Sequence, residues 1–202
     1  DVSVLSAQHA KFMKTPVDFD PCEYLGVFEA ACYLEPRLLE RASPLETGLR
    51  PMRQDGPIGE PVAFARDLDS CGKLCLANPS EVDLSQSCRL IPVFRDPERD
   101  RIVWDRRIRN AAEHPLRGAS QRLVGGAALC EYELLPAHEL IMYAEDLSDF
   151  YPSFTSSVAR AQTNTLNRLI PTSALSSTRA ARQRRGQLGE HCVICIRSLV
   201  MG

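Results

Sequence analysis

Two carboxylates, three residues apart, follow a short apolar run in the second half of the chain. In the stretch YAEDLSDFYPSF, which covers residues 143–154, these carboxylates belong to Asp146 and Asp149. A buried strand does not tolerate charged carboxylates unless another group compensates them, because burial removes their hydration. The pair therefore indicates either the acidic start of a helix, where the helix dipole favours negative charge, or a site for a hard cation such as Mg²⁺.

A second group of charged and amide side chains lies upstream, in a predicted β-hairpin. Its members are Arg101, Asp105, Arg107 and Asn110. The β-prone runs CRLIPVFR (88–95) and RIVWDRR (101–107) flank the turn-forming cluster DPERD, and this pattern predicts two paired strands. Since side chains alternate along a strand, we expect positions 101, 105 and 107 on one face. Such a row is either a solvated ladder of ion pairs or a positively charged surface held by its central carboxylate.

In their order and spacing, these two groups resemble the polymerase domain of reverse transcriptases. In that family a fingers hairpin with the pattern R-x-x-x-D-x-R-x-x-N precedes an apolar strand that ends in D-x-x-D-x followed by an aromatic residue. The stretch from Asp146 to Tyr151 meets the second pattern. The sequence RSLVMG at 197–202 stands where the family carries a Leu-Pro-Gln-Gly-like turn after a further helix. The resemblance covers residues 86–202.

The resemblance implies a templated transfer of deoxynucleotides to a primer 3′-OH, in which two Mg²⁺ ions neutralise charge on the attacking and leaving oxygens. It makes the carboxylate of Asp146 the catalytic metal ligand and the carbonyl of Leu147 its helper. It places Asp149 beside the triphosphate as an organiser, and it makes Tyr151 the aromatic gate that crowds a ribose 2′-OH.

The same resemblance assigns roles within the hairpin. Arg101 corresponds to the fingers arginine that contacts the phosphate of the incoming nucleotide, and Arg95 is the basic residue available before the turn. The remaining members of the motif are expected to be structural; they are Asp105, Arg107 and Asn110. The implied partners are an RNA or DNA template–primer and a dNTP.

The implied fold is α+β: the fingers and a partial palm of a right-hand polymerase, made of a β-hairpin and a partial antiparallel sheet with helices. We divide the chain into a helical N-terminal region of unknown role (1–85), a fingers-like hairpin and connection (86–130), and a partial palm (131–202). The first region carries no pattern that we can assign to a family.

The sequence departs from the family pattern at three places. Phe94 and Arg95 stand where one or two lysines are usual, and Val200 and Met201 replace Pro-Gln. The second carboxylate pair, a Tyr-x-Asp-Asp hairpin in the family, would lie beyond Gly202, so we expect a truncated piece of a retroelement-type enzyme that is inactive alone. Two other interpretations stay open: a non-catalytic polymerase-like scaffold that binds RNA or protein, and an unrelated interaction module whose acidic pair caps a helix.

Charge is distributed unevenly along the chain. Residues 86–130 carry 9 basic and 5 acidic side chains, residues 131–157 carry 0 and 6, and residues 158–202 carry 7 and 1. Most basic side chains are Arg, which suits bidentate recognition of phosphate, although a codon bias toward Arg would give the same composition. The stretch RAARQRR at 179–185 either follows a nucleic-acid backbone or forms a solvated loop.

Cysteine usage and hydropathy restrict the compartment. The 8 Cys lie at scattered spacings without a secretory signal, so we expect a reducing intracellular compartment, the cytoplasm or the nucleus. The sequence HCVIC at 191–195 has metal-like spacing, but a buried strand explains it equally well and no second pair completes a zinc site.

No apolar run approaches the roughly 20 residues of a membrane helix, so no membrane is expected as a partner. The oligomeric state stays open.

Local patterns predict the remaining elements. A helix begins at the Asp20 cap and carries an apolar stripe to Leu38 with a break at Pro36. We expect a Pro- and Gly-rich loop before a second helix, and a third helix behind Ser caps. We also expect a mobile Ser-, Ala- and Arg-rich loop and a final strand. The Pro- and Gly-rich loop is expected at 43–61, the second helix at 62–77 and the third helix at 156–169. The mobile loop is expected at 171–189 and the final strand at 191–200.

Overall fold

A three-stranded antiparallel sheet and a separate β-hairpin organise the chain. The computed structural model describes residues 19–49, 54, 56–97, 99–115, 133–139, 141 and 153–198. The strands in these ranges are β1 (Leu74–Ala77), β2 (Arg89–Asp96), β3 (Arg99–Asp105), β4 (Ile170–Pro171) and β5 (His191–Ile196). The α-helices are α1 (Val27–Leu34), α2 (Gly59–Ser70), α3 (Arg107–Ala112), α6 (Val158–Gln162) and α7 (Arg179–Gln183). The 3₁₀ helices are η1 (Pro21–Glu23), η2 (Pro36–Leu39), η3 (Pro79–Glu81), η4 (Leu84–Gln86) and η6 (Thr172–Leu175). The expected α+β class is therefore confirmed.

The central strand of the larger sheet is β5, which has the order β1-β5-β4 around it. Its register with β1 runs from Leu74 opposite Ile196 to Ala77 opposite Val193. All residues of β5 after His191 are buried, because both faces of the sheet are covered. The predicted final strand is confirmed for residues 191–196, and its continuous apolar composition follows from burial on two sides.

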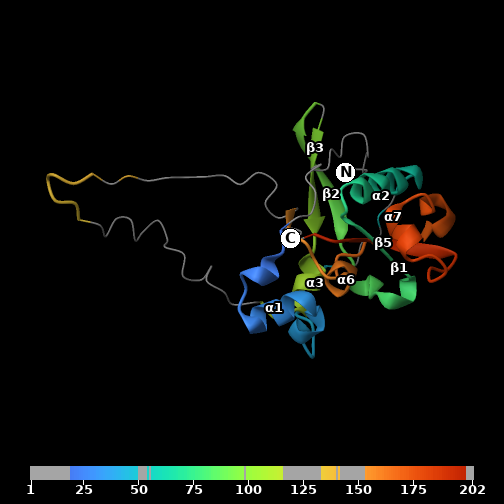
Figure 1. Cartoon of the computed structure of the whole chain (residues 1–202), viewed down its shortest axis with the longest axis horizontal. Coiled ribbons are helices and arrows are strands. Elements are labelled where there is room, and N and C mark those ends of the chain that lie inside the picture. The colour runs from blue at the N-terminus through green and yellow to red at the C-terminus, as the bar shows by residue number, and fades with distance from the viewer. Residues whose placement is uncertain are drawn as a thin grey trace.

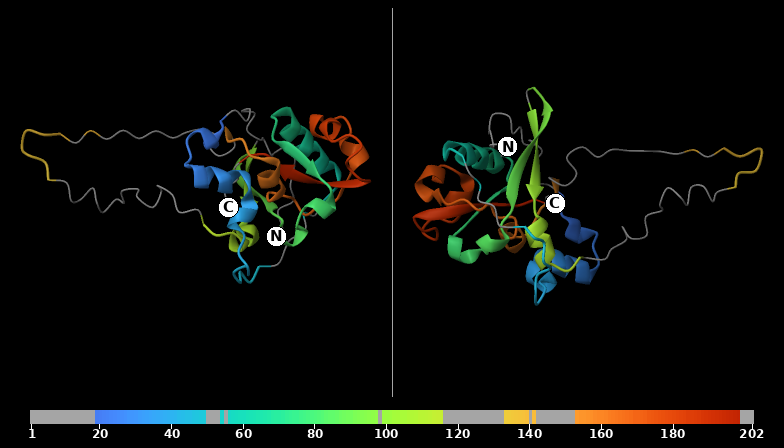
Figure 2. Two further views of the ribbon diagram at one scale, coloured as in Figure 1. Left: turned by 60° about the horizontal axis from the view of Figure 1, so that its bottom comes forward. Right: turned by 180° about the vertical axis from the view of Figure 1, so that it is seen from behind.

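Alternation along β5 divides the interior into two layers. Cys192, Ile194 and Ile196 belong to the larger core, which also takes residues from α2, β1, the hairpin, η6 and α7. Val193 and Cys195 face a smaller cluster with residues of β1 and α6. The sheet thus separates α2 and α7 on one face from α6 on the other, and Figures 1 and 2 show α2 beside α7 in each view.

The predicted β-hairpin is confirmed. Strands β2 and β3 pair antiparallel from Arg89 opposite Asp105 to Asp96 opposite Arg99, with a register shift near the tip. The hairpin projects away from the rest of the fold, and its base packs on α2 through Trp104 and Phe64, whose ring centroids lie 6.0 Å apart (Figure 1). One expectation was wrong: β3 ends at Asp105, so Arg107 does not share a strand face with Arg101 but begins α3.

The second predicted helix is shorter than its apolar pattern indicated. Helix α2 ends at Ser70, and Gly72 then adopts a φ of 73°, a left-handed conformation that favours glycine and terminates helices. Residues 74–77, expected to be helical, form β1 instead. The reason is tertiary, because these four residues pair with β5, more than a hundred positions later in the chain.

The first predicted helix is divided into three short pieces. Asp20 caps η1 as expected, accepting a hydrogen bond from the backbone N–H of Cys22 at 2.9 Å, and the break at Pro36 is confirmed. The predicted apolar stripe is not the buried face, however, since its members Tyr24, Phe28 and Leu38 are exposed. The buried residues of α1 are instead Cys32 and Tyr33, whose carbonyls accept hydrogen bonds from Arg160 of α6.

The third predicted helix and the predicted mobile loop also differ from expectation. Behind its Ser157 cap, α6 extends only to Gln162. Residues 171–189 do not form an unstructured loop, because they contain η6 and α7, with Leu175 and Ala180 in the core. Arg179 and Arg184 of this stretch bond to Ser70 and Glu81, which lie more than a hundred positions earlier, and no local composition signal reveals such contacts. Within the described residues, no helix is long and apolar enough to cross a membrane.

Candidate functional site

The register of the hairpin determines which of its residues face outward. Leu90 and Trp104 point into the core and are 2% and 5% exposed. Because side chains alternate, position 101 and its cross-strand partner Val93 lie on the opposite face, where Val93 is exposed. Arg95 is also exposed, near the projecting tip. The structure therefore brings the two predicted nucleotide-binding positions of the hairpin to its outer part.

The other members of the motif form a junction between β3 and α3. The carboxylate of Asp105 accepts hydrogen bonds from Nε and Nη2 of Arg107 at 2.8 and 2.7 Å. This arginine holds the pKa of the Asp105 carboxyl below its usual range, although partial burial acts in the opposite direction. Oδ1 of Asn110 accepts a hydrogen bond from Nη1 of Arg106 at 2.9 Å. These contacts order the junction after β3.

Behind this junction lies a buried ionic cluster that the sequence analysis did not identify. The carboxylate of Glu113 receives Nε of Arg109 at 2.8 Å, Nη2 of Arg106 at 3.1 Å and Nη1 of Arg160 at 3.5 Å. The side chains of all four residues are at most 12% exposed. Three guanidinium groups thus surround one buried carboxylate, and we call these four residues the Glu113 cluster.

The Glu113 cluster connects segments that are far apart in the sequence. Arg160 of α6 donates from Nη2 to the carbonyl of Cys32 at 2.6 Å and from Nε to the carbonyl of Tyr33 at 3.2 Å. Arg109 of α3 donates to Oε1 of Glu40 at 3.0 Å and to Oε1 of Gln86 at 2.8 Å. The N-terminal helices, the segment before the hairpin, α3 and α6 are thereby held together by one polar network.

Opposing influences set the charge state of Glu113. Burial raises the pKa of its carboxyl, but Arg106, Arg109 and Arg160 together outweigh this effect and hold the pKa below its usual range. Burial in turn lowers the pKa of Arg160, while Glu113 acts to raise it. The carboxylate therefore stays ionised at neutral pH. Only one signal in the sequence pointed to the cluster, the helical i, i+4 spacing of Arg109 and Glu113.

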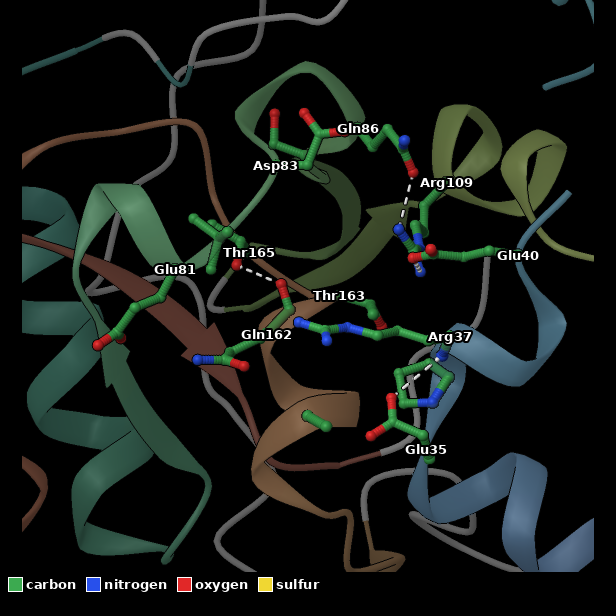
Figure 3. Close-up of a pocket in the computed structure, with 14 residues that line it drawn as sticks. Glu35, Arg37, Glu40, Glu81, Asp83, Gln86, Arg109, Gln162, Thr163 and Thr165 are labelled. Carbon is green, nitrogen blue, oxygen red and sulfur yellow. Dashed lines mark hydrogen bonds and ion pairs between the residues drawn. The ribbon is translucent and has the colours of Figure 1, made fainter. Parts of the chain in front are cut away.

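A cavity of about 300 Å³ adjoins the Glu113 cluster (Figure 3). Its lining comes from η2, the η3–η4 segment, α3 and α6, and it includes Glu40, Arg109 and Thr163. Figure 3 shows the side chain of Arg37 extending into this space toward Gln162. Acidic, basic and hydroxyl groups are mixed in the lining, and those of Glu40 and Arg109 are already paired with each other.

Four predicted site residues lie outside the described part of the chain: Asp146, Leu147, Asp149 and Tyr151. Among the residues that the structure describes, no group of three or more His, Cys, Asp and Glu side chains could hold a metal ion. Cys192 and Cys195 of the HCVIC sequence are buried on opposite faces of β5, in the two separate core clusters. The strand interpretation of this sequence is therefore confirmed.

Comparison of the chain with protein-family models, with curated proteins and with solved structures found no match.

Proposed function

We propose that this chain carries the fingers hairpin and the first carboxylate strand of a reverse transcriptase. The observation that supports the proposal is the hairpin itself: β2 and β3 pair antiparallel, and β3 carries Arg101 and Asp105 of the R-x-x-x-D-x-R-x-x-N pattern. A different pairing, or a helix at these positions, would have removed the basis for aligning Arg101 with the fingers arginine of the family.

Two features of the hairpin support this assignment. In the register of the hairpin, position 101 lies on the face opposite Leu90 and Trp104, and Arg95 is exposed in the projecting part. The contacts of Asp105 and Asn110 hold the strand–helix junction that follows position 101. A guanidinium suits this role because it binds phosphate oxygens through paired N–H groups.

The proposed metal ligands agree in chemical type with Mg²⁺. This ion prefers oxygen donors and binds to enzymes through one or two carboxylates together with the phosphates of the substrate. The carboxylate of Asp146 and the carbonyl of Leu147 are donors of this kind. The ion would neutralise charge on the triphosphate when bound. The sequence contains no Tyr-x-Asp-Asp, so the property that we assign to this chain is metal-dependent nucleotide binding rather than turnover.

Binding of a fluorescent dATP analogue, with and without Mg²⁺, tests the proposal. We expect Mg²⁺ to strengthen binding, and Asp146→Asn to remove this dependence. Arg101→Gln should weaken binding about ten- to a hundredfold, since a hydrogen bond to a charged group contributes about 1.5–3 kcal/mol. Tyr151→Ala should reduce the preference for dATP over ATP, because the ring would no longer crowd the 2′-OH.

The matched control is Arg37→Gln, which removes one exposed guanidinium outside the hairpin and should leave nucleotide binding unchanged. Nucleotide binding that is insensitive to both Mg²⁺ and Arg101→Gln would contradict the proposal. Binding of RNA without any binding of dATP would favour the non-catalytic scaffold instead.

A further inference from the structure

Helix α7 and the turn after it expose arginines along one side. Arg179 and Arg182 are neighbours on the surface of α7, and Arg185 follows in the turn after the helix, where its backbone N–H donates to the carbonyl of Arg182 at 3.3 Å. Arg66 of α2 lies next to this region, because its Nη2 donates to the carbonyl of Ala174 in η6 at 3.3 Å. We call these four residues the α7 arginine surface; Figures 1 and 2 show the two helices that carry it side by side.

Helix α7 is firmly attached to the fold. The carboxylate of Asp69, at the end of α2, accepts hydrogen bonds from the backbone N–H groups of Arg179 and Ala180 at 2.8 and 3.0 Å. Thr178 caps the helix by accepting from the backbone N–H of Ala181 at 3.1 Å. Because Ala180 also packs in the core, the arginines are presented on an ordered element rather than on an extended tail.

The arginines of this segment differ in how their charges are compensated. Arg184 points toward β1 and η3, where both carboxylate oxygens of Glu81 accept its N–H groups at 2.7 Å. Arg179 has a weaker ion pair, with 3.9 Å between its Nε and Asp69. The guanidinium groups of Arg182 and Arg185 are exposed and make no hydrogen bond or ion pair with any described residue. Two uncompensated positive charges therefore face solvent.

The surroundings of these charges indicate what kind of partner they fit. Residues 170–198, all of which the structure describes, contain no exposed large hydrophobic side chain. The exposed neighbours are instead hydroxyl and amide groups, including those of Ser176, Gln183 and Gln187. A membrane-surface helix needs an apolar face, and a protein interface needs an apolar centre. Arg, Ser and Gln side chains are typical contacts to the phosphates and sugars of nucleic acids.

We propose that the α7 arginine surface binds the phosphate backbone of a nucleic-acid strand without reading its sequence. The surface is separate from the hairpin, and the inference does not rest on the proposed polymerase function. Binding comes from the release of counterions when guanidinium groups approach phosphates, so it depends strongly on salt.

The test measures fluorescence anisotropy of a labelled single-stranded oligo(U), in Mg²⁺-free buffer without dNTP, at several NaCl concentrations. For Arg182→Gln combined with Arg185→Gln, we expect the slope of log affinity against log salt to fall by about 1.4, which corresponds to about 25-fold weaker binding at 0.1 M salt. The double Lys variant at these two positions keeps both charges and should retain the slope. Arg37→Gln, in an acidic region near Glu35 and Glu40, should also leave it unchanged.

Unchanged thermal unfolding of the Gln variants would show that any loss of affinity is not a loss of fold, because both side chains are exposed and unpaired. An unaltered affinity and salt slope in the double Gln variant would overturn the proposal, as would absence of RNA binding at low salt. Binding to equimolar phosphatidylserine–phosphatidylcholine vesicles that is lost in the same variants, without RNA binding, would also overturn it. Since the assay contains no nucleotide triphosphate or metal, its outcome is independent of the dATP experiment.

Discussion

Replacing Glu113 by Gln removes the carboxylate at the centre of the Glu113 cluster while keeping the size of the side chain. In the native fold this carboxylate receives N–H groups from Arg106, Arg109 and Arg160. An amide retains one acceptor oxygen, but its NH₂ group then faces arginine donors. Among the described residues, the half-exposed Glu40 would then be the remaining acidic partner of the three buried guanidinium groups.

The expected loss of stability is large for a single substitution. Breaking a buried ion pair by removing one partner costs about 3–5 kcal/mol, because the remaining charge stays desolvated and uncompensated. The free energy of unfolding of a domain is about 5–15 kcal/mol, so the variant should lose a substantial part of it. With a urea m-value of about 2 kcal/mol/M, the midpoint of unfolding should fall by about 2 M.

The sole tryptophan provides the assay. Trp104 is buried at the base of the hairpin, so its fluorescence reports docking of the hairpin, while far-UV circular dichroism reports the secondary structure. Coincident urea transitions from the two probes would show two-state behaviour. The control is Glu40→Gln, which removes the charge of one half-exposed partner of Arg109 and should cost less than about 1 kcal/mol.

The effect of Glu113→Gln should depend on pH in one direction. The pKa of Glu113 is lower in the folded state than its unfolded value of about 4.3. Its contribution is therefore complete above the unfolded pKa and is lost as the pH falls through the folded pKa. The difference between wild type and variant should be constant from about pH 7 to 5.5 and shrink at lower pH. A cost equal to that of Glu40→Gln, or a difference independent of pH, would refute the reasoning.

Three further predictions concern the core, a turn and the thiols. Phe64→Ala should destabilise the fold by about 3–5 kcal/mol and shift the emission of Trp104 to the red, because a large side chain in contact with the indole is removed. Gly72→Ala should cost about 1–2 kcal/mol in urea unfolding, since the φ of 73° disfavours a Cβ atom although no neighbouring atom would clash. Peptide mapping after alkylation of the native protein should show Cys71 modified well before Cys88. Burial raises the pKa of the Cys88 thiol to about 11 and limits access to it, whereas Cys71 is partly exposed. Equal rates for these two thiols would contradict this explanation.

Sequence patterns succeeded where the determining interactions are local. The hairpin followed from two β-prone runs around DPERD, and the start of η1 followed from Asp20 and Pro21. They failed at residues 74–77 and 171–189, where the structure depends on distant partners. Strand β1 forms because β5 is available to pair with it, and the first N–H groups of α7 donate to Asp69 of another helix. The apolar stripe from Tyr24 to Leu38 was predicted to be buried but is exposed, because helical periodicity does not determine which side of a helix the rest of the chain covers.

For the candidate site, the sequence alone determined the order and spacing of the motif residues, and therefore the resemblance on which the proposed function rests. Only the tertiary structure showed that Asp105, Arg107 and Asn110 belong to a strand–helix junction and that position 101 lies on the outer face of the hairpin. It also assembled the Glu113 cluster from α3 and α6, and it separated the compensated Arg184 from the uncompensated arginines of α7. The ion pairs of Arg160 in the Glu113 cluster and of Arg184 join segments that are remote in sequence. The distances between these segments are set only when the helices pack on both faces of the sheet.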